Sequence, residues 1–185
     1  MDSIELMMEE HKNIKRMLKV VRSFCFKVLK GTDASYDDLY LMIDFIRNYA
    51  DKHHHGKEEQ FLFNKMQEEL NEAIKKTIQF GMLVEHDQGR FFINSLDEAI
   101  KKVLGGEEEA KLDVIANAIS YANLLDRHID KEDKIVYKFA KNNLSGETLA
   151  SINKNCEDFE VNANNSGIQD KYLDSLNNLE KKYLA

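Results

Sequence analysis

The pattern His-x-x-x-Glu occurs twice in this chain, at His54 with Glu58 and at His128 with Glu132. On an α-helix, residues four apart lie on one face, so each pattern directs an imidazole and a carboxylate toward the same point. A buried glutamate is costly unless a cation pairs with it. The repeat therefore predicts two helices that face a shared polar centre.

Two further histidines lie on other segments, His11 and His86, and each stands in a stripe of apolar residues spaced by three and four. A single core histidine is more often a structural residue than a ligand. Here, however, successive candidate histidines are separated by about one helix and its turn, which lets all four share a level. Four inward imidazoles and two inward carboxylates favour a metal centre, with two metals because carboxylates from two helices can bridge a pair of cations.

The spacing of apolar residues predicts four long helices. The chain contains no proline and only eight glycines, which favours uninterrupted helices. We expect helices at residues 2–30, 36–70, 73–104 and 107–142. Together they form an all-α, up-down-up-down four-helix bundle over residues 1–142. The remaining residues, 143–185, are expected to be a C-terminal helical extension packed on the same domain, with helices at 147–160 and 168–184 and a polar loop at 162–167.

Composition argues against several classes of partner. The formal net charge is −7 and no helix carries a basic face, so nucleic acid is not expected to bind. No stretch has the length and apolarity of a membrane span, and the N-terminus lacks the pattern of a secretory signal, which predicts a cytoplasmic protein. Cys25 and Cys156 are far apart in the sequence, which indicates neither a disulfide framework nor a thiolate metal site.

The ligand types also favour particular metals. Mixed imidazole and carboxylate ligands suit iron or manganese, whereas a closed tetrahedral zinc site needs fewer groups than this chain offers. The ferritin-like di-iron pattern uses Glu-x-x-His pairs. This chain has His-x-x-x-Glu instead, so the ferritin-like alternative is set aside.

Only one frame of His53, His54 and His55 can face the core, because successive helical residues are about a third of a turn apart. The apolar stripe favours His54 with Glu58. His55 with Glu59 is the competing frame, and a kink at Gly56 would bring Glu59 toward the centre. His53 and His55 would then be exposed or would orient a ligand.

Two tyrosines lie near the predicted ligands. Tyr49 stands about one turn before His54, and Tyr121 about two turns before His128. Their hydroxyls either approach a bound small molecule or belong to side chains that only pack in the core.

Four stretches, EEHKNI, HHHGKEEQFLF, VEHDQGR and RHIDKEDKIVY, together resemble the cation-binding branch of the hemerythrin family over about residues 1–142. The resemblance implies a non-haem di-iron centre, with the carboxylates and an oxo or hydroxo group bridging the two irons. The metal ligands it implies are His11, His54, Glu58, His86, His128 and Glu132.

One departure from the family pattern concerns the third helix. Oxygen-carrying hemerythrins have His-x-x-x-His there, whereas the positions four away from His86 are Met82 and Arg90. The smaller number of histidines leaves more coordination positions on the metals open, which puts simple oxygen carriage in doubt. The resemblance implies a module that binds or senses dioxygen, nitric oxide or peroxide. The alternatives are a di-iron redox enzyme served by a redox partner, which reduces nitric oxide or peroxide or repairs iron-sulfur clusters, and an iron-responsive regulator.

Overall fold

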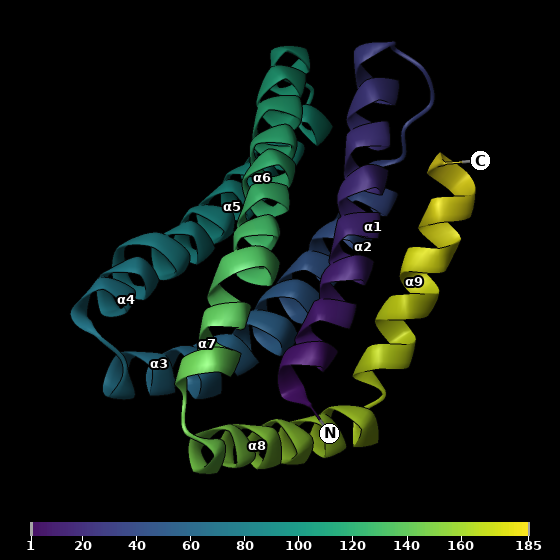
Figure 1. The fold of residues 1–185 in the computed structure, drawn as a ribbon. Helices are drawn as coiled ribbons and strands as arrows, with labels where there is room; N and C mark the ends of the chain where they lie inside the picture. The colour runs from purple at the N-terminus through teal and green to yellow at the C-terminus, as the bar shows by residue number, and fades with distance from the viewer. Residues whose placement is uncertain (1, 185) are drawn as a thin grey trace.

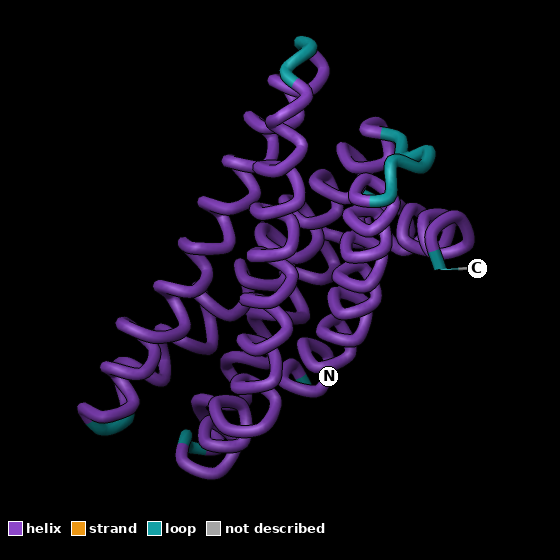
Figure 2. The backbone as a smooth tube through the Cα atoms, turned by 90° about the horizontal axis from the view of Figure 1, so that it is seen from above, coloured by secondary structure: helices purple, strands orange, loops and turns teal. Residues whose placement is uncertain are grey.

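The computed structural model describes residues 2–184, and every regular element in that range is a helix. Four long rods run beside one another and two further helices follow, which confirms the predicted all-α bundle with extra C-terminal helices (Figures 1 and 2). None of the helices in residues 2–184 has the length and apolarity needed to cross a membrane.

The rods are built from the following elements. The first is α1 (Ser3–Leu29), and the second comprises α2 (Tyr36–Phe45), η1 (Ile46–His55), η2 (Glu58–Phe63) and α3 (Asn64–Glu69). The third comprises α4 (Glu72–Thr77), η3 (Ile78–Met82) and α5 (Leu83–Leu104). The fourth comprises η4 (Glu108–Ala110), α6 (Lys111–Lys131), η5 (Glu132–Val136) and α7 (Tyr137–Asn143), and it is followed by α8 (Gly146–Asn165) and α9 (Ile168–Tyr183).

The helices end where the sequence contains residues suited to caps and turns. Gly31 and Gly106 have φ angles of 65° and 98°, in the left-handed region that glycine adopts without steric cost. The predicted loop at 162–167 is wrong in extent, because α8 continues to Asn165. Ser166 Oγ donates to the Asn162 carbonyl, and Gly167, with a φ of 65°, begins the turn into α9.

The two C-terminal helices cover the bundle in different ways. Helix α8 crosses the end of the bundle where the N-terminus lies, and α9 returns alongside α1 and α2 (Figure 1). Four buried side chains of α9 belong to the same apolar cluster as those of α1 and α2; they are Tyr172, Leu176, Leu179 and Tyr183. The Arg16 guanidinium on α1 also pairs with the Glu180 carboxylate on α9, at 2.5 Å.

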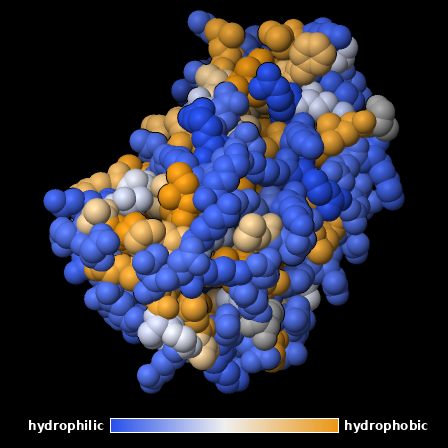
Figure 3. Space-filling view, viewed as in Figure 1, coloured by the Kyte–Doolittle hydropathy of each residue, from blue (hydrophilic) through white to orange (hydrophobic). Residues whose placement is uncertain are grey.

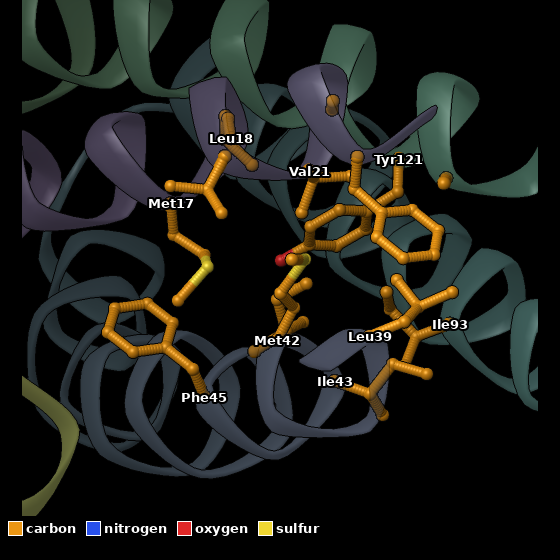
Figure 4. Packing of buried hydrophobic residues seen from close by; sticks show 14 of the residues in the cluster. Met17, Leu18, Val21, Leu39, Met42, Ile43, Phe45, Ile93 and Tyr121 are labelled. Atoms are coloured by element: carbon orange, nitrogen blue, oxygen red, sulfur yellow. The ribbon is translucent and has the colours of Figure 1, made fainter. Parts of the chain in front are cut away.

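The apolar core has two parts. The larger cluster fills the bundle from Ile14 to the far ends of the rods, and Figure 4 shows its side chains from α1, α2, α5 and α6 pointing toward one another. The smaller cluster lies near α8 and includes Met7, Phe63, Met82 and Val136. Between the two clusters, each rod carries its predicted site residues. The face seen in Figure 3 is mostly hydrophilic, with apolar side chains scattered over it.

Four segments of the rods are π-helical, with backbone hydrogen bonds from residue i to i+5. Three of them contain candidate ligands, namely His54 in η1, Glu58 in η2 and Glu132 in η5. One extra residue per turn rotates the inward face of the helix after the segment. The spacing of three from Glu132 favours Ile135 as an inward side chain, and this expectation is wrong: Ile135 is 62% exposed, whereas Val136 and Tyr137 are 4% and 1% exposed.

Candidate metal centre

The six predicted ligands meet in the polar layer between the two apolar clusters, and each is at most 1% exposed. Their ligand atoms fall into two groups, in each of which all the atoms lie within 4.8 Å of one another. The first group, called here group A, consists of His11, His54, Glu58 and Glu132. The second, group B, consists of His55, Glu58, His86 and His128.

Histidine nitrogens approach one another closely in both groups. His11 Nε2 lies 2.8 Å from His54 Nε2, and His86 Nε2 lies 2.9 Å from His128 Nε2. Two ligand atoms that each lie about 2.1 Å from the same ion, with about 90° between their bonds to it, are roughly 3 Å apart. The spacing of each nitrogen pair is therefore that of neighbouring ligands on a shared cation.

The other nitrogen of each of these four histidines contacts an outer carboxylate. The four Nδ1 contacts are His11 with Asp133 at 2.7 Å, His54 with Glu10 at 2.8 Å, His86 with Glu59 at 2.7 Å, and His128 with Glu85 at 2.8 Å. A carboxylate accepts from Nδ1–H, which fixes the ring and leaves Nε2 for the centre. This arrangement is typical of histidines that bind metal.

The outer carboxylates show a regularity that sequence reasoning missed. Each one is adjacent in sequence to a candidate ligand on its own helix, yet it holds a histidine on another helix. Glu10 precedes His11 but contacts His54, and Glu85 precedes His86 but contacts His128. Glu59 and Asp133 follow the two inward glutamates in the same way. The acidic neighbours were visible in the sequence, whereas their partners depend on how the helices pack.

The inward carboxylates provide a test of whether a metal fits. Glu132 presents Oε1 to His128 Nε2 at 2.9 Å and Oε2 to His11 Nε2 at 3.4 Å. Glu58 Oε2 lies 3.7 Å from His54 Nε2 and 3.6 Å from His86 Nε2. Both Glu132 oxygens and Glu58 Oε2 are buried and accept no well-formed hydrogen bond from residues 2–184. Such oxygens are costly without a cation, so the residues present fit a metal.

Burial and mutual charge set the protonation of this centre. Burial, reinforced by the charge of Glu132, raises the pKa of Glu58 to about 8. Burial disfavours ionised Glu132 as well, but the charge of His128 and the contacts with histidines hold its pKa well below the ordinary value. Burial opposes protonation of His11 and His128, yet their carboxylate neighbours raise the two pKa values to about 9 and about 10. Protons therefore balance the carboxylate charge when no metal is bound.

The interpretation of His53 and His55 as exposed residues is wrong, since they are 2% and 5% exposed. The π-helical turn of η1 turns both inward, and α8 covers His53. The His55 ring stacks on His86, with centroids 3.8 Å apart and planes 8° apart, and joins group B. Gly56 has helical φ and ψ angles of −56° and −39°, so no kink occurs there.

Three tyrosines surround the centre at different distances. Tyr137, which sequence reasoning did not single out, donates its hydroxyl hydrogen to Glu58 Oε1 at 2.5 Å and stacks on His11. Tyr49 accepts a hydrogen bond from Asn13 and is packed in the core. Tyr121 is also buried, and its ring lies 3.5 Å from the point that a Cβ on Gly89 would occupy.

A cavity of about 310 Å³ adjoins group B. Its lining combines apolar side chains with charged ones and includes His55, His86, Gly89, Arg90, Tyr121 and Leu125. No member of group A lines it. The two halves of the centre therefore differ in access.

Known proteins place this chain in a family. A sequence model of the Hemerythrin HHE cation binding domain matches residues 2–140. Uncharacterized proteins of Mycobacterium bovis and Mycobacterium tuberculosis are 23% identical to this chain over 157 residues, which is 84% of its length, and the chain spans 60% of theirs. No solved structure gives a significant match. With its buried His and Glu groups and a family match over most of its length, the chain belongs to the hemerythrin family of HHE cation-binding domains and is a metal-binding protein.

Proposed function

We propose that this chain holds two non-haem iron ions, one at group A and one at group B, and binds or senses dioxygen, nitric oxide or peroxide there. The observation that carries the proposal is the paired arrangement of the ligands. In each of two histidine pairs the Nε2 atoms lie close together, while every Nδ1 atom contacts an outer carboxylate. The Glu132 carboxylate offers one oxygen to each group.

Each residue has a distinct part in holding the metals. His11 and His54 would serve one ion, while His55, His86 and His128 would serve the other. Glu132 would bridge through its two oxygens, and Glu58 Oε2 lies within reach of both groups. Nitrogen and oxygen ligands without thiolate suit iron. Iron bound here would supply redox chemistry toward small oxidants, and the burial of the ligands would limit its contact with bulk water.

His55 bears on the departure from the family pattern. The third helix lacks a second histidine, but the His55 ring from η1 lies against His86 and supplies an imidazole at the same end of the centre. Group B thus has three histidines where the sequence alone offered two. The cavity beside His55 and His86 gives a small molecule a route to group B, which we propose as the ligand-binding half.

Metal analysis after anaerobic reconstitution with ferrous iron tests the proposal. We expect two irons per chain and, after oxidation, the absorption of a bridged ferric pair. One metal per chain, or a preference for zinc without that absorption, would contradict it.

Exposure to oxygen, nitric oxide and peroxide separates binding from turnover. An adduct that reverses on degassing supports the binding or sensing role. Many turnovers with a reductant present would instead support the second candidate, a redox enzyme. The cavity supports this second candidate, because its volume of about 310 Å³ is larger than a diatomic molecule requires.

A further inference from the structure

A second buried cluster of charged groups lies beside group A. Lys57 is fully buried, and its ammonium group donates to Glu10 Oε1 and to Glu160 Oε1. His53 Nε2 is 3.1 Å from each of the same two oxygens. Gln169 donates to the other oxygen of Glu160. Glu160 belongs to α8, which lies wholly outside the residues that match the family.

The ammonium group of Lys57 occupies the position that a metal ion would otherwise take in this cluster. Glu10, His53 and Glu160 offer ligand atoms within 4.8 Å of one another, as in groups A and B. Here, however, the chain supplies its own cation. Two buried carboxylates share one lysine, so part of the negative charge on Glu10 remains available to another partner.

That partner is a predicted metal ligand. Glu10 Oε1 contacts Lys57, and Glu10 Oε2 accepts from Nδ1 of His54 at 2.8 Å. A continuous path of contacts therefore leads from Glu160 through Lys57 and Glu10 to His54. We infer that Glu160 is a positioning residue for the metal centre, and that α8 completes the surroundings of His54 from outside the family domain.

The effect of Glu160 follows from how Lys57 divides its charge. While Glu160 is present, Lys57 is held between two carboxylates, and Glu10 keeps enough charge to polarise the Nδ1–H bond of His54. Without Glu160, Lys57 would pair with Glu10 alone and weaken that polarisation. The Nε2 atom of His54 would then be a poorer electron donor to a metal. This inference rests on the proposed function, because it assumes that His54 binds a metal. The NMR signal of His54 in the metal-free protein can be measured without that assumption.

The variant Glu160→Gln removes the charge and keeps the shape. Glu157→Gln is the matched control, because Glu157 is exposed on the same helix. We expect Glu160→Gln to bind ferrous iron roughly tenfold more weakly in competition with a chelator, the lower end of the range for groups behind a metal ligand. The control should bind iron as the parent protein does.

Nitrogen NMR of the metal-free proteins gives a readout that does not need iron. Glu160→Gln should shift the Nδ1–H signal of His54 and leave that of His128, which Glu85 holds, unchanged. Adding Lys57→Met to Glu160→Gln should move the His54 signal back toward its original position, because no ammonium group then competes with His54 for Glu10, whose remaining partners are His53 and His54. A residue that only ties α8 to the bundle would not show this recovery.

Two results would overturn the inference. One is a Glu160→Gln protein that melts at a lower temperature while its iron affinity and its His54 signal match the parent. The other is a His54 shift that the second substitution does not reverse. If the parent protein binds no iron at all, the proposed function fails, and the His54 signals still decide the role of Glu160.

Discussion

Binding of metal should release about three protons per chain at pH 7. The pKa values of Glu58, His11 and His128 are raised to about 8, 9 and 10, so all three groups hold a proton at pH 7 in the metal-free protein. Each must lose it to become a ligand. His54, with a pKa lowered to about 4, has no proton to release. Burial opposes protonation of His86, but its contacts with Glu132 and Glu59 raise its pKa as well.

The protons can be counted by adding ferrous iron without oxygen to weakly buffered protein that contains a pH indicator. Calorimetry in two buffers with different ionisation enthalpies gives an independent count. The variant Glu58→Gln, measured at saturating metal, should release about one proton fewer, since the amide has none to lose. This difference also removes the contribution of water bound to the metal, which both proteins share.

The pH dependence of affinity provides a second measure of the same protons. Each displaced proton should raise metal affinity up to about tenfold per pH unit below its pKa. A release of less than one proton per chain at pH 7 would refute the reasoning. It would mean that the buried carboxylates and imidazoles are already deprotonated without a metal, against the charge balance inferred from their contacts.

Three further predictions concern stability, ligands and access. The pKa values of Glu58, His11 and His128 are raised on folding, so the stability they confer is present at low pH and is lost as the pH rises through about 8 to 10. The melting temperature of chelated protein should therefore fall between pH 7 and 10, while that of iron-loaded protein should fall less; equal curves would contradict a metal at this centre. Glu58→Ala should remove most of the bound metal, whereas Glu59→Ala should weaken binding roughly tenfold, as for other groups behind a ligand. Metal analysis distinguishes the two variants. If Glu59→Ala lost more metal than Glu58→Ala, Glu59 would be the ligand and Glu58 the group behind it. Gly89→Leu should fill the cavity and slow the association of azide with the iron-loaded protein at unchanged iron content, and an unchanged rate would mean that ligands enter elsewhere.

Local sequence patterns are sufficient to predict the fold and the inward direction of the six candidate ligands. The stripes around His11 and His86 repeat every three or four residues, and that spacing is visible without knowledge of any other helix. Such patterns predict which face of a helix is buried. They do not state which residues of other helices that face meets.

The features that escaped prediction depend on packing between segments. The π-helical segment that begins at Glu132 has no local sequence signature, so the spacing favours Ile135 for the core in place of Val136. For the same reason the sequence leaves His55 either exposed or behind a ligand, whereas the structure places it in group B. Glu160 lies more than a hundred residues from Lys57 in sequence, and only the position of α8 across the end of the bundle brings them together.

The layer of ionisable side chains divides the apolar core into two separate parts. Each long rod passes from one part to the other, so the molecule resembles two short bundles joined end to end through a polar joint. Apolar packing holds each part together on its own, but it does not extend across the joint. Whether the two ends unfold as one cooperative unit therefore depends on what occupies the joint, and a bound metal would link the four rods at the level where the core cannot.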